Sequence, residues 1–311
     1  MDSVADPAPP KKSLTALCAV VTGANKGIGL AVVRNLAELG VQVVLTARDE
    51  DRGLAAVRSL HSNGLTNVLF HQLDVRDPSS VTALACFLAD RFSKLDILVN
   101  NAGVSGVDVD AERLKALKVD PESWLSGKAT NLVNGVMEHK YEDAVVCIDT
   151  NYFGCKRVTE ALLPLLRLSP IGASIVNVSS LRSELRRIPN AAIRAELAEV
   201  EKLNEERIEG LLGRFLQDLK TGQLHVNGWP MMLPAYSMSK VVVNAYTRVM
   251  ARRHPDMRFN CVHPGFVKTD INWNTGIGTT DDGARAILML ALRPSGGPSG
   301  FYFQETTVAD F

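Results

Sequence analysis

The stretch "TGANKGIGL" at residues 22–30 decides how the rest of the chain is interpreted. It directly follows a β-branched apolar run and places Gly23, Gly27 and Gly29 where a strand must turn sharply into a helix. Glycine lets the backbone approach a bound group closely, and a helix start offers free N–H groups and a positive dipole end. In this strand–turn–helix context, the glycines predict a loop that binds the pyrophosphate of a dinucleotide.

Apolar runs of strand length alternate with amphipathic segments of helix length along the whole chain. The runs are continuous rather than alternating, which is typical of a parallel sheet covered on both faces. The pattern predicts an α/β fold with a doubly wound, mostly parallel sheet of the Rossmann type. The predicted strands lie within residues 16–22, 41–47, 67–73, 95–100, 173–180 and 257–265.

Two insertions interrupt this pattern, at about residues 104–147 and 182–230. The strand pattern resumes after each, so we expect one domain spanning residues 15–311, preceded by a Pro-rich, flexible tail at 1–14. The first insertion contains turn residues, charges and no clear strand. The second reads as helical, with Asn204 as an N-cap before an apolar stripe at helical spacing. The stripe consists of Ile208, Leu211, Leu212, Phe215 and Leu219.

Composition and charge exclude several classes of protein. The 311 residues include 34 basic and 34 acidic side chains, so no net charge is available to attract nucleic acid or an anionic membrane. No apolar run approaches the ~20 residues of a membrane helix. The five cysteines are scattered and form no C-x-x-C pair, which argues against disulfides and zinc and favours the cytosol. The six histidines suggest no metal site.

The end of the second predicted strand bears on which dinucleotide binds. A carboxylate there would bind the ribose diol and repel a 2′-phosphate. This chain has Arg48 at that point, and Lys26 in the glycine loop supplies a second cation. These cations favour NADPH, whereas Asp49, which follows Arg48, leaves NADH as the alternative.

The stretch "PAYSMSK" at residues 234–240 places Tyr236 and Lys240 four positions apart. On a helix these positions share one face, so the phenol and the ammonium can address the same small volume. A cation at this distance favours the phenolate, which would let a tyrosine act as a proton donor near neutral pH. The same spacing also arises by chance, so the rest of the chain has to decide.

Further motifs follow in an order that resembles the short-chain dehydrogenase/reductase family over essentially residues 17–311. The 56 positions between Ser180 and Tyr236 resemble the monomeric carbonyl-reductase branch, as does "NGWP" at 227–230. The earlier insertion resembles the plant subgroup that includes salutaridine reductase and the menthone and neomenthol reductases. The ordered motifs are "LDVRD" at 73–77, "NNAG" at 100–103, "TNYFG" at 150–154, "NVSS" at 177–180, "YSMSK" at 236–240 and "HPGFVKTD" at 263–270.

The resemblance implies a role for each catalytic residue. Tyr236 would protonate a carbonyl oxygen as hydride arrives from the nicotinamide, and Lys240 would lower the pKa of that tyrosine and hold the nicotinamide ribose. Ser180 would donate a hydrogen bond to the substrate oxygen, with Ser179 as its competitor because adjacent strand residues face opposite sides. Asn151 would support Lys240 through a water-linked proton relay.

The resemblance also implies a cofactor site and a pocket wall. Arg48 would hold the 2′-phosphate, and the first insertion would form a lid over an apolar pocket for a bulky ketone. The alternative for the two methionines of that wall is that they merely pack against the insertion. Cofactor contacts are expected from Gly23, Asn25, Lys26, Gly27, Ile28, Gly29, Arg48, Asp74, Val75, Asn101, Tyr236, Lys240, Pro264, Gly265, Val267 and Thr269. Substrate contacts are expected from Val104, Leu181, Met231, Met232 and Phe266.

The expected function is NADPH-dependent reduction of a carbonyl on a hydrophobic small molecule, a plant terpenoid or alkaloid. One alternative is reduction of a conjugated carbon–carbon double bond, as in some plant relatives that commonly lack the tyrosine. The other is a protein that senses NADPH without turnover. By analogy with the carbonyl-reductase branch, the second insertion would cover the usual oligomer interface and leave a monomer.

Overall fold

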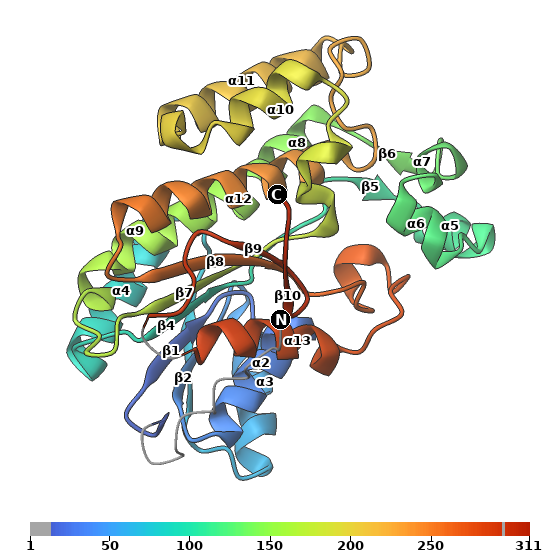
Figure 1. Cartoon of the computed structure of the whole chain (residues 1–311). Coiled ribbons are helices and arrows are strands. Elements are labelled where there is room, and N and C mark those ends of the chain that lie inside the picture. The colour runs from blue at the N-terminus through green and yellow to red at the C-terminus, as the bar shows by residue number, and fades with distance from the viewer. Residues whose placement is uncertain (1–13, 294–295) are drawn as a thin grey trace, which may run out of the picture.

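A sheet of eight strands forms the centre of the computed structural model, which describes residues 14–293 and 296–311 (Figure 1). The strand order is β3-β2-β1-β4-β7-β8-β9-β10, and β10 alone among these strands runs antiparallel to its neighbour. The chain reverses direction of winding between β1 and β4, where doubly wound sheets bind ligands. The strands are β1 (Cys18–Val21), β2 (Gln42–Ala47), β3 (Val68–Gln72), β4 (Ile97–Asn100), β7 (Ser174–Val178), β8 (Arg258–His263), β9 (Tyr302–Gln304) and β10 (Thr307–Ala309).

The predicted fold class is confirmed, and all six predicted strands are present. β1, β4, β7 and β8 are buried along their whole length, which explains why β1 and β4 are almost entirely apolar, while β7 and β8 also bury polar side chains such as Asn177 and Arg258. β9 and β10 were not predicted, because each has only three residues and no periodicity to detect. Of the predicted tail at 1–14, residues 1–13 lie outside the described residues.

Helices cover both faces of the sheet and build a separate apolar cluster on each. On one face α2, α3 and α13 contribute to a cluster that includes Val32, Leu60 and Ile287. On the other face α4, α9 and α12 contribute to a cluster that includes Leu84, Leu162 and Val242. The helices are α2 (Gly27–Glu38), α3 (Glu50–Ser62), α4 (Pro78–Phe92), α9 (Gly154–Leu166), α12 (Pro234–Arg253) and α13 (Thr280–Ala291).

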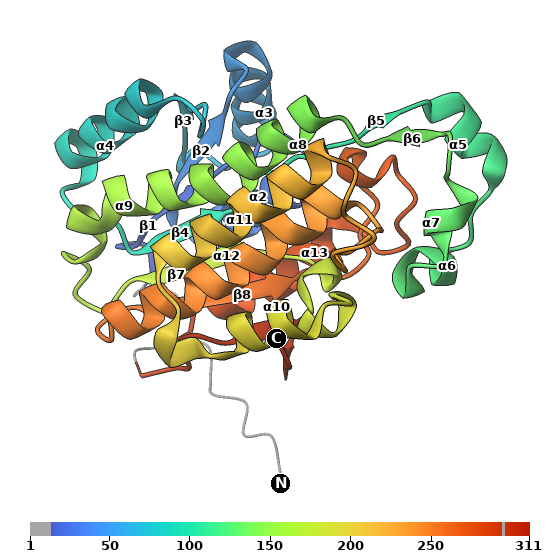
Figure 2. The same cartoon turned by 90° about the horizontal axis from the view of Figure 1, so that it is seen from above.

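The first insertion projects from one end of the molecule as a small unit that we call the lid, residues 104–147 (Figure 2). Its two short strands pair antiparallel, although the sequence predicted no strand here. Trp124, Leu114 and Met137 form a third apolar cluster with Met232. The lid contains β5 (Asp108–Val109), α5 (Ala111–Leu117), α6 (Pro121–Ser126), α7 (Ala129–Leu132), β6 (Met137–Glu138) and most of α8 (Tyr141–Ile148).

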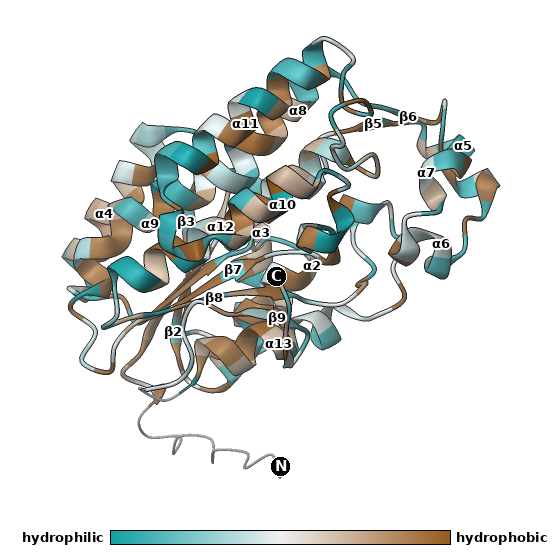
Figure 3. Ribbon diagram, turned by 45° about the horizontal axis from the view of Figure 1, so that its top comes forward, coloured by the Kyte–Doolittle hydropathy of each residue, from teal (hydrophilic) through white to brown (hydrophobic). Residues whose placement is uncertain are grey.

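The second insertion is helical, as predicted, and lies beside α12 and α8 (Figures 1 and 2). Asn204 caps its longest helix by accepting a hydrogen bond from the Arg207 N–H at 2.9 Å. Four residues of the predicted stripe are buried, while the opposite face of this helix is hydrophilic (Figure 3). The insertion contains η3 (Leu185–Arg187), α10 (Ala191–Ala198), η4 (Val200–Lys202) and α11 (Glu205–Lys220), after the short turn η2 (Leu181–Ser183).

Two further turns complete the framework of the site. The π-helical turn η1 (Asp149–Phe153) joins α8 to α9, and the 3₁₀ turn η5 (Asp270–Asn272) follows β8. Within the described residues, no helix combines the length and apolar character needed to cross a membrane.

Candidate active site

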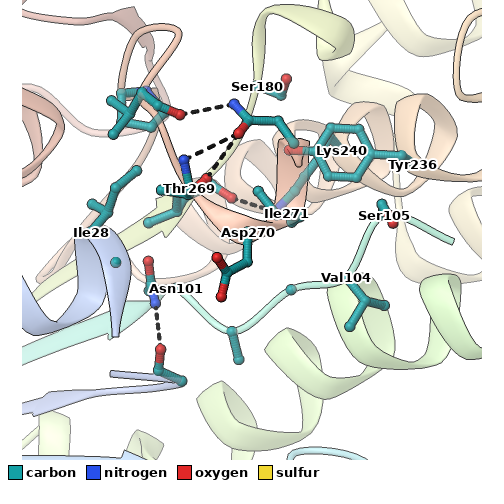
Figure 4. A pocket seen from close by; sticks show the side chains of 18 of the residues that line it. Ile28, Asn101, Val104, Ser105, Ser180, Tyr236, Lys240, Thr269, Asp270 and Ile271 are labelled. Carbon is teal, nitrogen blue, oxygen red and sulfur yellow. Dashed lines mark hydrogen bonds between the residues drawn. The ribbon is translucent and has the colours of Figure 1, made fainter. Parts of the chain in front are cut away.

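A cavity of about 750 Å³ opens at the edge of the sheet where the parallel strands end (Figure 4). Open α/β sheets bind their ligands at this edge. Most of the predicted cofactor and catalytic residues line it, while Gly29 and Asn151 do not. The predicted residues that line it are Gly23, Asn25, Lys26, Gly27, Ile28, Arg48, Asp74, Val75, Asn101, Ser180, Tyr236, Lys240, Pro264, Gly265, Val267 and Thr269.

The three positions of the loop after β1 favour glycine for different structural reasons. Gly23 and Gly27 both have φ of +61°, a left-handed conformation that favours glycine. A Cβ atom on Gly23 would also lie 2.9 Å from the Ala102 Cα. Gly29 has no unusual φ, but a Cβ there would lie 2.5 Å from the Asn101 Nδ2. Gly29 therefore permits close packing behind the loop rather than contact with the cavity.

Asn101 fixes this loop to the end of β4. Its Nδ2 donates to the carbonyl oxygens of Thr22 and Gly23, at 2.9 and 3.0 Å. The Thr22 Oγ1 in turn accepts from the N–H groups of Asn101 and Ala102, both at 3.0 Å. Asn101 thus holds the loop in shape, and its place beside a ribose stays a prediction.

The N-terminus of α2 faces the cavity through Gly27 and Ile28. Its N-cap residue, Lys26, makes no capping hydrogen bond, and its first turn contains no acidic residue. The positive end of the helix dipole therefore lacks the internal anion or acceptor that usually satisfies such an end. Together with the left-handed glycines, these groups fit the pyrophosphate of a dinucleotide.

Cations dominate the end of β2. Arg48 is exposed and lines the cavity. Asp49 caps α3 by accepting from the Arg52 N–H at 2.9 Å, and its carboxylate lies 3.2 Å from the Arg52 Nε. The carboxylate that left NADH as the alternative is therefore engaged within α3, and Arg52 adds a cation to the cavity wall. Lys26 has an ion pair of its own, because its Nζ lies 2.6 Å from the Asp270 Oδ2.

Tyr236 and Lys240 lie on the first turns of α12 and both face the cavity (Figure 4). The Lys240 Nζ is 5.7 Å from the centre of the Tyr236 ring and donates to the Val178 carbonyl at 2.7 Å. Lys240 is only 4% exposed, and this burial lowers the pKa of its ammonium group to about 8. The lysine can thus change its protonation state close to neutral pH.

The expected direction of the Tyr236 pKa shift is not found in this structure. Burial raises the pKa of the phenol to about 12, opposed by a hydrogen bond with Ser180 and by the charge of Arg182. Desolvation outweighs these favourable contacts because it acts on the whole phenolate charge. The phenol is therefore protonated at neutral pH, as a proton donor must be, and Lys240 is not the residue that stabilises its anion here.

The two neighbouring serines at the end of β7 face different surroundings. The Ser179 Oγ is buried and donates to the Asn244 Oδ1 at 2.5 Å. The Ser180 side chain caps η2, is less buried and hydrogen-bonds with Tyr236. The Ser180 carbonyl is held by Ser183 and by the Tyr302 hydroxyl. Ser179 is thus occupied by a buried partner, and the role of Ser180 toward a substrate stays a prediction.

Asn151 lies in η1, directly behind the cavity wall. Its Oδ1 accepts from the Val104 N–H at 2.8 Å, and its Nδ2 donates to the Val104 carbonyl at 3.0 Å. The Nδ2 also donates to the Ser239 Oγ at 2.9 Å. Asn151 therefore connects the start of the lid to α12. A Cβ on Gly103 would lie 3.2 Å from the Asn151 Oδ1 and 3.6 Å from the Lys240 Nζ, so these two side chains flank the same glycine.

The wall of the cavity near Tyr236 is largely apolar. Val104, Leu181, Met232 and Phe266 line it, in agreement with the prediction, and Trp124 of the lid lines it too. Met231, which was expected on this wall, does not line this cavity, because its side chain is 40% exposed and lines a neighbouring cavity instead. Successive side chains in this segment before α12 point in different directions. Met232 also belongs to the apolar cluster that includes lid residues, so it packs against the first insertion as well as lining the cavity.

His263 ends β8 and lines the cavity while only 7% exposed. Burial, with repulsion from Arg187 and Arg182, lowers its pKa to about 4, so it is neutral at physiological pH. In the parts of the chain that the structure describes, no three His, Cys, Asp or Glu side chains gather as metal ligands.

Several other lining residues were not singled out from the sequence, among them Arg52, Arg182, Trp124 and Trp273. Arg52 and Arg182 each resemble an ordinary surface arginine in sequence, and Trp124 and Trp273 lie in segments without periodicity. The two tryptophan rings are 6.4 Å apart, so the lid touches the segment after β8. Only the position of Arg182, two residues after Ser180, gave any signal.

Comparison with known proteins supports a common origin. The family model "short chain dehydrogenase" matches residues 17–195. "Short-chain dehydrogenase/reductase 1" from Saponaria officinalis is 49% identical, and the match covers 94% of this chain and 95% of the length of that protein. Salutaridine reductase from Papaver bracteatum is 45% identical over 94% of this chain and 96% of its own. Carbonyl reductase [NADPH] 1 from Mus musculus is 37% identical over 93% of this chain and 96% of its own.

Solved structures agree with the sequence relatives. Salutaridine reductase from Papaver somniferum superimposes with a TM-score of 0.87 at 44% identity, covering 93% of this chain and 99% of that chain. Menthone neomenthol reductase from Mentha piperita gives a TM-score of 0.81 at 38% identity, covering 94% and 99%. The matched motifs, the sheet order and these similarities agree that the chain belongs to the short-chain dehydrogenase family of oxidoreductases.

Proposed function

We propose that this protein uses NADPH to reduce a ketone on a hydrophobic small molecule, a plant terpenoid or alkaloid, to a secondary alcohol. The observation that carries this proposal is the meeting of three groups at one cavity. The Tyr236 phenol, the Ser180 hydroxyl and the Lys240 ammonium share it with the N-terminus of α2. Reduction of a carbonyl requires a proton source and hydrogen-bond donors aimed at the developing alkoxide.

Each catalytic side chain has a distinct role in this reaction. When bound, NADPH supplies the hydride that adds to the carbonyl carbon. The Ser180 hydroxyl donates a hydrogen bond to the carbonyl oxygen, and the Tyr236 phenol transfers its proton to that oxygen. Lys240 holds the ribose and, with a pKa of about 8, returns a proton toward the phenol. Asn151 keeps the start of the lid in register with α12.

The choice of NADPH over NADH rests on charge. Arg48 and Arg52 line the cavity at the end of β2, while the nearby Asp49 is engaged as a helix cap. Arginine matches the geometry of a phosphate group, whereas a free carboxylate would repel it. The mouse relative carries NADPH in its name. Gly23, Asn25, Gly27 and Ile28 would hold the phosphates, with Asp74 and Val75 near the adenine and Val267 and Thr269 near the nicotinamide.

The substrate is proposed to be apolar because of the wall opposite Tyr236. Val104, Leu181, Met232 and Phe266 offer aliphatic, thioether and aromatic surfaces, and Met adapts to irregular shapes. The lid adds Trp124 to this wall. Salutaridine reductase and menthone neomenthol reductase, both similar over most of the chain, are named for small organic substrates.

The proposal further holds that the protein is a cytosolic monomer that binds neither nucleic acid nor membranes. All five cysteines are free, which suits a reducing compartment. α11 covers a face of α12 that would otherwise be available for a subunit contact. Light scattering at micromolar concentration should give the mass of one chain, 33.8 kDa. A stable dimer or tetramer would contradict the monomer.

The decisive experiment follows NADPH absorbance with menthone, an isatin-type dione and a polycyclic alkaloid ketone. Tyr236→Phe keeps the ring and removes only the proton donor, so turnover should fall by roughly 100- to 10,000-fold. NADPH binding should persist in this variant, which shows that the site is folded. Turnover that survives the substitution would overturn Tyr236 as the acid and favour reduction of a conjugated double bond.

A further inference from the structure

A second cavity of about 510 Å³ lies beside the active-site cavity. Arg182 and Met232 line both cavities and therefore form the wall between them. Pro230 and Met231 supply apolar surface to the second cavity, while Arg186 and Arg187 join Arg182 in it. Met231, which was expected on the wall of the first cavity, lines this second cavity instead.

Positive charge in the second cavity is only partly balanced. Arg186 and Arg187 share one acidic partner, because both approach the Glu184 Oε2, at 2.9 and 3.0 Å. Glu184 is only 4% exposed, and its carboxylate is the acidic partner of both arginines. Three guanidinium groups beside one carboxylate leave a formal excess of two positive charges at this place.

Arg182 carries the least compensated of these charges. In the described part of the chain it has no carboxylate within ion-pair distance, and its Nη2 donates instead to the neutral carbonyl of Trp124. Burial and repulsion from Arg187 lower the pKa of Arg182 to about 10. A partly buried guanidinium with a cationic neighbour is costly unless an anion approaches it.

The same guanidinium is close enough to the reaction centre to influence it. The charge of Arg182 opposes the rise in the Tyr236 pKa, so the two groups interact through space. Arg182 also follows Ser180 by two residues and donates its backbone N–H to the Ser180 Oγ at 3.1 Å. A single molecule can therefore place an anionic group at Arg182 and a carbonyl at Tyr236 and Ser180.

We propose that the second cavity binds an oxyanion carried by the substrate, held between Arg182 and Arg187 while the carbonyl lies at Tyr236. This inference rests on the proposed function and narrows it to apolar ketones that bear a carboxylate, sulfate or phosphate group. The planar fork of arginine suits such groups. Pro230, Met231 and Met232 would contact the carbon skeleton between the two polar ends.

The first test compares keto acids with their neutral methyl esters. A cyclohexanone carboxylate and a longer aryl keto acid are each assayed beside the ester, and the ratio of kcat/KM for acid to ester is measured. We expect at least one acid to be preferred by roughly tenfold or more, a difference of about 1.4 kcal/mol. Because a ratio is used, any shared loss of catalysis cancels. A ratio of one for both pairs in the wild type would overturn the proposal.

Substitutions then assign the preference to Arg182. Arg182→Met should bring the ratio to about one, and Arg182→Lys, which keeps the charge, should retain most of it. Arg285→Gln is the matched control, because this arginine is 72% exposed and its charge partner is Asp282. An acid preference that survives Arg182→Met would contradict the site. Unchanged NADPH affinity shows that the Arg182→Met protein is folded.

A binding measurement separates this inference from the proposed function. Cyclohexanecarboxylate has an anionic group and no ketone, so titration calorimetry reports the anion site without turnover. Wild type should bind it at least tenfold more tightly than Arg182→Met. Binding without turnover of any ketone would support the anion site and overturn the proposed reductase. Reduction of the esters without carboxylate binding would support the reductase and overturn the anion site.

Discussion

The ammonium of Lys26 lies 2.6 Å from a carboxylate oxygen of Asp270, so an ion pair joins the phosphate loop to the segment after β8. Both side chains are more than half exposed, and both residues line the active-site cavity. The carboxylate therefore competes with a bound phosphate for Lys26. An exposed pair of this kind is weak and can exchange partners readily.

Removal of this competitor should strengthen coenzyme binding. We expect Asp270→Asn to tighten NADPH binding by about three- to fivefold, since the energy of an exposed ion pair is small. Lys26→Ala should weaken NADPH binding by about tenfold. Fluorescence titration with NADPH and with NADH measures both effects. Weaker NADPH binding in Asp270→Asn would show that the ion pair shapes the loop rather than competes with phosphate.

Arg48 should decide between the two coenzymes. In Arg48→Gln the KM for NADPH should rise by roughly 10- to 100-fold, because a charge-assisted contact to the 2′-phosphate is lost. The KM for NADH should stay within about twofold, since NADH has no such phosphate. Arg58→Gln, an exposed substitution on the same helix as Arg52 but outside the cavity, is the control. Equal losses for both coenzymes would place Arg48 elsewhere than at the 2′-phosphate.

Activity should depend on pH through Lys240. Below its pKa of about 8 the lysine is an ammonium ion that can resupply a proton, and above it this proton is lost. Reductive kcat/KM should therefore fall as the pH rises through about 8. Tyr236, whose pKa is about 12, stays protonated over this range and cannot cause the decline. In Lys240→Arg the inflection should vanish, and an inflection that persists would assign it to another group.

Trp124 should stabilise the lid through its ring and not through its N–H. The side chain is 4% exposed and contacts the Trp273 ring, yet its Nε1 has no hydrogen-bond partner among the described residues. Trp124→Phe should cost less than about 1.5 kcal/mol, since it keeps an apolar ring. Trp124→Ala should cost about 3–5 kcal/mol through the cavity it leaves. Hydrogen exchange over residues 104–147 measures the difference locally, and equal effects would point to a role for the N–H.

The sequence predicted the centre of the fold because buried parallel strands leave an unmistakable pattern. β1, β4 and β7 are short and buried along their whole length, and the glycine loop marks the end of β1. β9 and β10 lie outside this rule, since three residues show no periodicity. The lid hairpin was missed for the same reason, as each of its strands has two residues.

The site was predictable where a motif fixes the geometry and not where packing decides it. Ser180 and Ser179 could be separated because adjacent residues at a strand end face different sides. Met231 and Met232 could not, because no regular element governs their directions. The Tyr236 pKa also depends on burial that only the assembled cavity supplies. Arg182 needed the neighbouring Arg187 and Glu184 to become distinctive, and these are brought together by the turns η2 and η3.

Leu114, Trp124 and Met137 of the lid belong to an apolar cluster that is separate from the two on the faces of the sheet, and Met232 before α12 completes it. Ala144 and Cys147 of α8 instead belong to one of the sheet clusters, so only the part of the lid before α8 packs apart from the sheet. Mutations in residues such as Leu114 or Trp124 can reshape the wall of the pocket while the sheet keeps its margin against unfolding. During evolution, substitutions in this part of the lid can therefore change the preferred substrate while the residues that bind the coenzyme and transfer the proton stay in place.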